Sequence, residues 1–125
     1  MLKVNYYYFF FIVFTASLSL STTRGETHLV GDDEGWTQFP NFTYWAKGKS
    51  FHVGDTLVFS YAQELHNVVQ VNGTSYEDCI MEPNLGVLQS GNDSITVAEV
   101  GQLWYICGVE DHCKNGQKLT IEVLP

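Results

Sequence analysis

Four residues near the C-terminal end of the chain suit a soft transition metal: Cys107, His112, Cys113 and Gln117, within ICGVEDHCKNGQKL. A thiolate and an imidazole five residues apart favour copper over a catalytic pair, because thiolate suits Cu(I) and imidazole suits both copper oxidation states. Copper electron-transfer sites combine two His and one Cys with a weak axial Met or Gln. The spacing therefore indicates a copper site that uses Cys107, His112 and Gln117.

A second histidine must come from elsewhere in the chain, and His66, in LHNVVQV, is the best candidate. Taken alone, His66 could equally be an ordinary polar loop residue, and Gln117 could be a surface residue. His28 and His52 have no potential ligands at a useful spacing, so we interpret both as structural.

Two other kinds of site are disfavoured. A zinc finger would need paired C-x₂₋₄-C or H-x₃₋₅-H elements, and the sequence contains neither. A Cys–His hydrolase would need a third residue to orient the histidine, and no such group or nucleophile elbow is recognisable. Cys107 could also be a buried free thiol, but that interpretation leaves the Cys–His–Gln spacing unexplained.

The segments that must position these side chains read as short strands separated by turn residues, which predicts an all-β antiparallel sandwich or small barrel. We expect strands within 27–31, 50–61, 67–71, 87–100, 102–107 and 117–124. Gly54-Asp55 predicts a hairpin or corner, and turns are expected at Asn72-Gly73 and at 91–93. A short helix is expected within 40–49, one helical turn within 75–79, and a loop over 80–86.

The N-terminus has the form of a secretory signal. Lys3 precedes the apolar run YYYFFFIVFTASLSL, and small residues follow in STTRG. A membrane anchor is the alternative, but it would usually need about 20 apolar residues. We expect residues 1–25 to be removed by cleavage after Gly25. Because the sequence up to Pro125 has no hydrophobic tail for a lipid anchor, we expect a secreted, extracellular protein of the apoplast or cell wall without stable membrane insertion.

Export gives meaning to the three cysteines, since an odd number in an oxidising compartment leaves one unpaired. Cys107 and Cys113 are too close to pair without a tight loop. If Cys107 holds a metal, Cys79 and Cys113 remain available for a disulfide.

Export also makes the three N-x-S/T sequons, at Asn41, Asn72 and Asn92, potential glycan acceptors on exposed turns.

The chain is acidic, with a formal net charge of −8 at pH 7. Removal of residues 1–25 would also remove Lys3 and Arg24, which makes the remaining domain more acidic still. This charge argues against nucleic acid or an anionic membrane as the main partner. It fits a cationic or neutral partner, or acidity that serves solubility.

The motifs together resemble the phytocyanins, the plant-specific branch of the cupredoxins. They are GW, YW-x-K-G-K, VGD-x-L-x-F-x-Y, H-N-V and C-x₄-HC-x₃-Q, and the likeness covers essentially all of residues 26–125. The resemblance implies one phytocyanin domain over 26–125, with a Greek-key β-sandwich or barrel and one or two short helices.

For the site, the resemblance implies one type 1 copper ion on His66, Cys107 and His112, with axial Gln117 as in stellacyanins. It implies a Cys79–Cys113 disulfide and a role for Asn67 in the hydrogen bonding around the Cys107 sulfur. It also implies a one-electron carrier, not an enzyme, acting as a monomer with small redox molecules or an extracellular redox partner. A wall-associated binding or structural protein, or a copper buffer, is the alternative.

One departure from the family pattern concerns the residues before the second histidine. Many relatives have Gly just before it, whereas this chain has Glu110-Asp111. We expect these carboxylates near the exposed edge of the site, where they should favour Cu(II), although solvent would screen them.

Overall fold

Alternating apolar residues build β3 and β8, each of which lies between two other strands of its sheet. The computed structural model describes residues 25–125, so the predicted signal segment lies outside the described residues except for Gly25. In β3 (Thr56–Ser60), Leu57 and Phe59 are fully buried, as their alternation predicts. In β8 (Lys118–Leu124), the same pattern buries Leu119, Ile121 and Val123.

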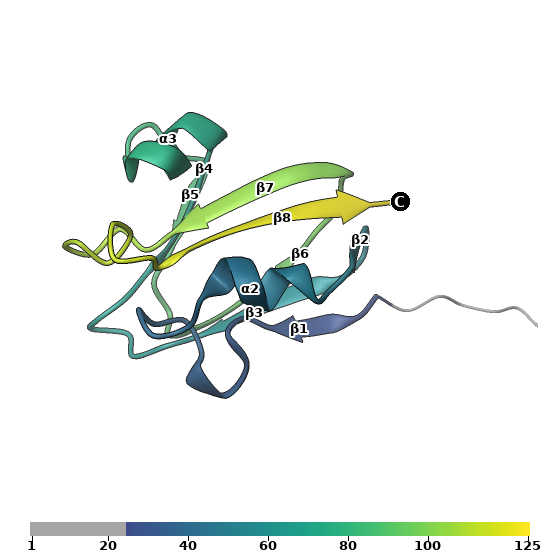
Figure 1. The fold of residues 1–125 in the computed structure, drawn as a ribbon, viewed down its shortest axis with the longest axis horizontal. Coiled ribbons are helices and arrows are strands. Elements are labelled where there is room, and N and C mark those ends of the chain that lie inside the picture. Colours follow the sequence, from purple (N-terminus) through teal and green to yellow (C-terminus); the bar gives the residue numbers. More distant parts are fainter. Residues whose placement is uncertain (1–24) are drawn as a thin grey trace, which may run out of the picture.

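Within residues 25–125, eight strands form two sheets packed as a sandwich (Figure 1), which confirms the all-β prediction. The three-stranded sheet has the order β1-β3-β6, and the five-stranded sheet has the order β2-β8-β7-β4-β5. The remaining strands are β1 (Thr27–Leu29), β2 (Phe51–His52), β4 (Val68–Val71), β5 (Gly86–Leu88), β6 (Asn92–Thr96) and β7 (Gly101–Ile106).

The sheets are mixed: beside the expected antiparallel pairs, each sheet contains one parallel pair. β1 pairs in parallel with β3, and β2 pairs in parallel with β8. The reason is that β1, β2 and β3 alternate between the two sheets instead of returning as hairpins. Gly54-Asp55 is therefore a corner between β2 in one sheet and β3 in the other.

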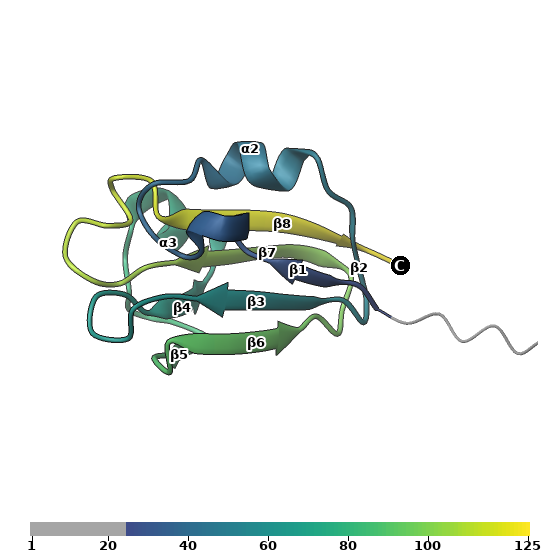
Figure 2. The same cartoon turned by 90° about the horizontal axis from the view of Figure 1, so that it is seen from below.

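Two short α-helices and one 3-10 turn, η3 (Asp32–Glu34), complete the described elements. Helix α2 (Phe42–Lys47) begins after Asn41, whose side chain accepts from the Tyr44 N–H, and ends at Gly48. It lies beside β8 along one side of the sandwich (Figure 2) and buries Phe42 and Trp45. Within residues 25–125, neither helix is long and apolar enough to cross a membrane.

Two predicted turns are wrong in detail. Asn72 caps helix α3 (Gly73–Asp78) instead of forming a turn, because its Oδ1 accepts from the Ser75 N–H at 2.8 Å. Asn92 and Asp93 belong to strand β6, and only Gly91, with φ of 88°, keeps a turn conformation there. The Asp93 carboxylate is buried and accepts from the hydroxyls of Tyr61 and Ser90, which satisfies it inside the sheet.

The core between the sheets is aromatic and reaches the end of the molecule that carries the metal-binding candidates. Trp36 contacts Phe42 and Phe59 with ring centroids 4.9 and 5.1 Å apart, and Phe59 contacts Tyr105 at 5.4 Å. Each such pair contributes about 0.5–1.5 kcal/mol beyond its buried area. The β3–β4 and β7–β8 loops lie together at one end of the sandwich, opposite the C-terminus (Figure 1).

Candidate metal centre

Strand pairing brings together segments that are far apart in sequence. His66 lies two residues before β4, and Cys107 directly follows β7. Because β4 and β7 pair antiparallel, with Val69 opposite Ile106, the start of one strand lies beside the end of the other. The pairing of β7 with β8 then places Gln117 next to Cys107, whose N–H donates to the Gln117 main-chain oxygen at 3.0 Å.

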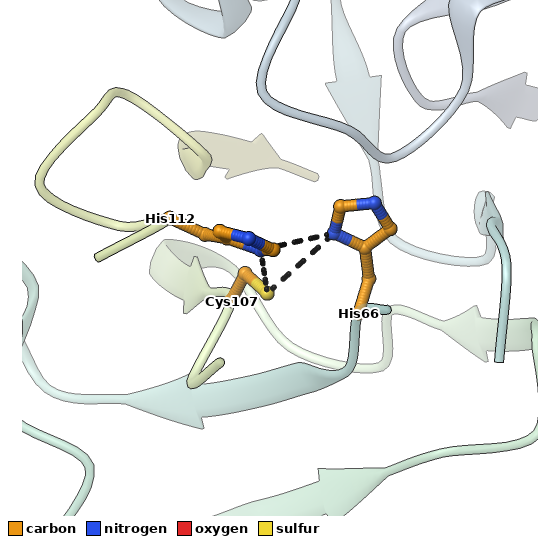
Figure 3. A group of neighbouring side chains, drawn as sticks. All are labelled: His66, Cys107 and His112. Carbon is orange, nitrogen blue, oxygen red and sulfur yellow. Dashed lines mark hydrogen bonds between the residues drawn. The ribbon is translucent and has the colours of Figure 1, made fainter. Parts of the chain in front are cut away.

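Three donor atoms converge at this end of the sandwich (Figure 3). The Cys107 Sγ lies 3.5 Å from the His112 Nδ1 and 4.0 Å from the His66 Nδ1, and the two Nδ1 atoms are 3.2 Å apart. Metal–nitrogen and metal–sulfur bonds to such ligands are about 2.0–2.3 Å long. One ion can therefore bind between all three atoms, so the donor set fits a single metal ion.

The three side chains differ in their access to solvent. Cys107 is 1% exposed and His66 is 8% exposed, whereas His112 is only half-buried. A metal held here would be shielded from water on most sides. The His112 ring would be its edge toward the surface.

Burial shifts the pKa values of the two buried ligands, His66 and Cys107, toward their neutral forms. Burial, followed by the neighbouring His112, lowers the pKa of His66 and so favours the neutral imidazole that binds metals. Burial raises the pKa of the Cys107 thiol, while hydrogen bonds from the main-chain N–H groups of Asn67 and Val109 act in the opposite direction. Those two N–H groups are therefore directed at the sulfur and favour its thiolate form.

Asn67 connects the two loops that carry the ligands. Its Oδ1 accepts from the Gly108 N–H at 2.6 Å, and its main-chain oxygen accepts from the Trp36 Nε1 at 2.7 Å. The residue after His66 is thus bonded to the residue after Cys107. This link restrains the position of the sulfur relative to the first histidine.

The Gln117 amide contains an unpaired acceptor. The residue is fully buried, and its Nε2 donates to the main-chain oxygen of Trp36 at 3.1 Å. Its Oε1 has no hydrogen-bond partner by distance and angle, although it lies near enough to the His66 ring to favour the protonated imidazole. A buried polar atom without a partner costs about 1–3 kcal/mol, so this oxygen needs an explanation.

A disulfide anchors the second histidine. Cys79 and Cys113 are bonded, with Cα atoms 5.8 Å apart, which confirms the predicted pairing and leaves Cys107 as the free cysteine. Cys79 directly follows helix α3, and Cys113 directly follows His112. The bond therefore ties the loop that carries His112 to the scaffold.

Trp36 is a site residue that sequence reasoning missed. It is fully buried, bonds to Asn67 through its indole N–H and positions the Gln117 amide through its main-chain oxygen. The sequence did carry a signal for it, since Trp36 belongs to the GW motif. That motif is too short to reveal hydrogen bonds to residues that lie 31 and 81 positions away.

The carboxylates next to the second histidine lie at the surface. Glu110 and Asp111 are exposed, as expected, and Glu110 adopts a left-handed conformation with φ of 45°. This backbone region favours glycine. Asp111, which directly precedes His112, does not adopt it. The exposed Glu64 and Leu65 precede His66 on the facing loop, so the edge of the site carries acidic and apolar side chains.

The fold and this Cys–His–His site define a class, the blue copper proteins, and comparison with known proteins agrees. A family model described as "Plastocyanin-like domain" matches residues 36–117. Blue copper protein 1a of Medicago truncatula is 45% identical over 114 residues, covering 90% of this chain and 68% of that protein. Stellacyanin of Toxicodendron vernicifluum is 41% identical over 101 residues, covering 77% of this chain and 94% of that protein.

Among solved structures, cucumber stellacyanin superposes with a TM-score of 0.74 and 36% identity, covering 82% of this chain and 97% of that one. The chain belongs to the phytocyanin family. This confirms the resemblance identified from the motifs and the cupredoxin-like fold class. It also agrees with copper, one ion per domain, as the predicted cofactor.

Proposed function

We propose that this protein is an exported one-electron carrier whose single copper ion is held by His66, Cys107, His112 and Gln117. The observation that carries the proposal is the buried, unpaired Oε1 of Gln117. It lies near the ring of His66, which belongs to the converging set of one sulfur and two nitrogens. A fourth ligand bond would satisfy this oxygen. Gln117 would then take the weak axial position.

The bound copper would supply a Cu(I)/Cu(II) couple. The residues of the chain supply the conditions for a fast couple: a sulfur and two nitrogens already gathered, buried and restrained. Asn67 restrains Cys107, Trp36 restrains Gln117, and the disulfide restrains the loop of His112. Restraint of this kind reduces the rearrangement that a change of charge would otherwise cause.

The exchange surface is the half-buried edge of His112. Glu110 and Asp111 beside it favour a cationic small redox molecule or a partner protein with a basic docking face. Nucleic acid is disfavoured because the domain is acidic. We expect a monomer that has no enzymatic turnover of its own.

Export is part of this proposal. It is supported by the signal-like residues 1–25 and by the disulfide, which suits an oxidising compartment. The three sequon residues Asn41, Asn72 and Asn92 are all exposed, and so are accessible to glycosylation. In Asn41 and Asn72 the side-chain oxygen serves as the helix cap, which leaves Nδ2 free for a glycan.

The test is the visible absorption spectrum of residues 26–125 loaded with Cu(II). We expect an intense blue charge-transfer band that disappears in Cys107→Ser. The control is His52→Asn, at an exposed histidine of the opposite end of the sandwich, which should keep the band. A colourless wild-type protein, or one that binds zinc and copper alike without colour, would refute the proposal.

A further inference from the structure

The Asp55 carboxylate is a buried charged group that the copper site does not use. It is 3% exposed and lies at the corner between β2 and β3, at the end of the sandwich opposite the candidate metal centre. Its Oδ2 accepts from the His28 Nε2 at 2.9 Å and from the His52 N–H at 3.0 Å. Its Oδ1 accepts from the main-chain N–H of Glu26 at 2.8 Å.

These residues do not make a convincing second metal site. The potential ligand atoms of Glu26, His28 and Asp55 lie within 4.8 Å of one another. However, three donors already occupy both oxygens of Asp55, and no buried polar atom of this cluster lacks a partner within the described chain. The network is complete without an ion.

The donor on Oδ1 has a particular position in the chain. Glu26 is the residue that would become the N-terminus if residues 1–25 were removed by cleavage after Gly25. Its amide nitrogen, now a neutral donor, would then be an α-ammonium group. We propose that removal of the leader creates an ion pair between the new α-ammonium of Glu26 and the buried carboxylate of Asp55, and that this pair locks β1 onto the β2–β3 corner.

This inference rests on the export part of the proposed function, but not on copper. In the precursor the Asp55 carboxylate has a neutral donor at Oδ1, and after cleavage it would have a full positive charge at the same place. Charge-assisted hydrogen bonds are roughly twice as strong as neutral ones. A chain that begins at Glu26 should therefore be more stable than any form with additional residues on the N-terminal side of Glu26.

The two carboxylates nearest the new amine, those of Asp55 and Glu26, favour its protonated form, whereas a positive charge on His28 or His52 would oppose it. Within residues 25–125, the charged group at hydrogen-bond distance is Asp55. The Glu26 side chain adds a second carboxylate, and His28 on β1 and His52 on β2 complete the titratable neighbours.

Gly25 provides a matched control. A Cβ at this position would lie 1.8 Å from the Gly54 carbonyl oxygen, so any other residue would force the chain to shift. A chain that begins at Gly25 can keep the described path. It also keeps the neutral Glu26 N–H on Asp55 and only moves the ammonium by one residue.

The experiment compares a chain beginning at Glu26 with a chain beginning at Gly25, both without copper. The α-amine is titrated by ¹⁵N NMR. An ordinary α-amino group has a pKa of about 7.7–8.0. We expect the Glu26 amine to titrate above this range and the Gly25 amine to titrate closer to it.

Urea unfolding should show the same coupling. A folded-state pKa above the unfolded value adds stability that is fully present below the unfolded pKa and is lost as pH rises through the folded pKa. At pH 6.5 we expect the Glu26 chain to have a folding constant roughly fivefold to tenfold higher than the Gly25 chain. The advantage should vanish at pH values above the folded amine pKa.

Asp55→Asn in the Glu26 chain should return the amine to its ordinary range. If this variant does not fold, the comparison between the two N-termini still decides. Equal amine pKa values, or equal stability at pH 6.5, would overturn the ion pair.

Mass spectrometry of the full chain exported from a eukaryotic host should find Glu26 as the first residue, and another N-terminus would overturn the processing step. Loading both chains with Cu(II) afterwards gives a separate readout: a missing blue band would refute the copper proposal and leave the amine titration valid.

Discussion

The amide of Gln117 and the main-chain oxygen of Trp36 are joined by a hydrogen bond of 3.1 Å, and this bond leaves the Gln117 Oε1 buried without a partner. The two residues lie 81 positions apart in sequence. The bond takes up the only donor group of the side chain, so the amide presents an acceptor to the space near His66. This arrangement connects the aromatic core to the fourth ligand position of the proposed copper site.

Gln117→Met tests that position. An amide oxygen is a harder ligand than a thioether and should favour Cu(II), so the variant should have a higher reduction potential. We expect a rise of at least about 59 mV, which is a tenfold change in the equilibrium constant of a one-electron couple. Cyclic voltammetry of the copper-loaded proteins measures it. An unchanged or lower potential would show that Gln117 is not an axial ligand.

Asn67→Ala tests the link between the two ligand loops. The change removes the acceptor of the Gly108 N–H and should reduce the free energy of unfolding by about 1–3 kcal/mol. It should also shift the blue band, because the main-chain N–H groups around the sulfur lose their support. Urea unfolding of the apo-protein and the visible spectrum measure the two effects. A comparable loss of stability without any spectral change would limit Asn67 to a structural role.

The disulfide is tested by replacing Cys79 and Cys113 together with alanine. In the chain-entropy description, a bond that closes a loop of this length contributes about 3–4 kcal/mol. We expect a loss of that order in urea unfolding of the apo-protein. Copper affinity should fall as well, because His112 adjoins Cys113. Unchanged affinity in the folded double variant would mean that the loop holds His112 without the bond.

The carboxylates at the site edge are tested by Glu110→Gln with Asp111→Asn. Electron exchange with a cationic metal complex should slow several-fold at low ionic strength, and the difference should shrink as salt rises to 0.1 M and beyond. Stopped-flow kinetics measure it. The control is Glu99→Gln with Glu122→Gln, which removes two exposed charges elsewhere on the domain. An equal slowing of electron exchange in the control would show that the effect comes from the net charge of the domain and not from the position of Glu110 and Asp111.

Asp55→Asn should change the acid stability of the apo-protein. Burial alone would raise the pKa of Asp55, but the hydrogen bonds from His28 and from the main chain of His52 and Glu26 outweigh it, so the pKa is lowered below 3.8. A lowered folded-state pKa adds stability that is present above the unfolded pKa and is lost as pH falls through the folded pKa.

The wild type should therefore lose more stability than Asp55→Asn between about pH 4 and pH 2. Urea unfolding over this range measures the difference, with the exposed Glu122→Gln as the control. Parallel curves for wild type and Asp55→Asn would show that the Asp55 pKa does not differ between the folded and unfolded states.

Local sequence predicted the elements that depend on local chemistry. The alternation of Leu57 and Phe59 placed both side chains on one face of β3, and that face is buried. The helix expected within 40–49 contains α2. Local sequence gave the wrong element where an Asn can serve either in a turn or as a helix cap. Asn72-Gly73 is a common turn pair, but the free N–H of Ser75 makes Asn72 a helix cap instead.

The sequence by itself determined the type of site, because the Cys107–His112–Gln117 spacing suits a soft metal and the motifs belong to one family. The tertiary structure decided which residues that are distant in sequence come into contact. The convergence of His66 with Cys107 depends on the pairing of β4 with β7. The roles of Trp36 and Asp55 depend on hydrogen bonds to residues that lie 31 and 29 positions away. Such contacts join residues that are distant in the chain, and they form only once the packed core fixes the positions of the strands.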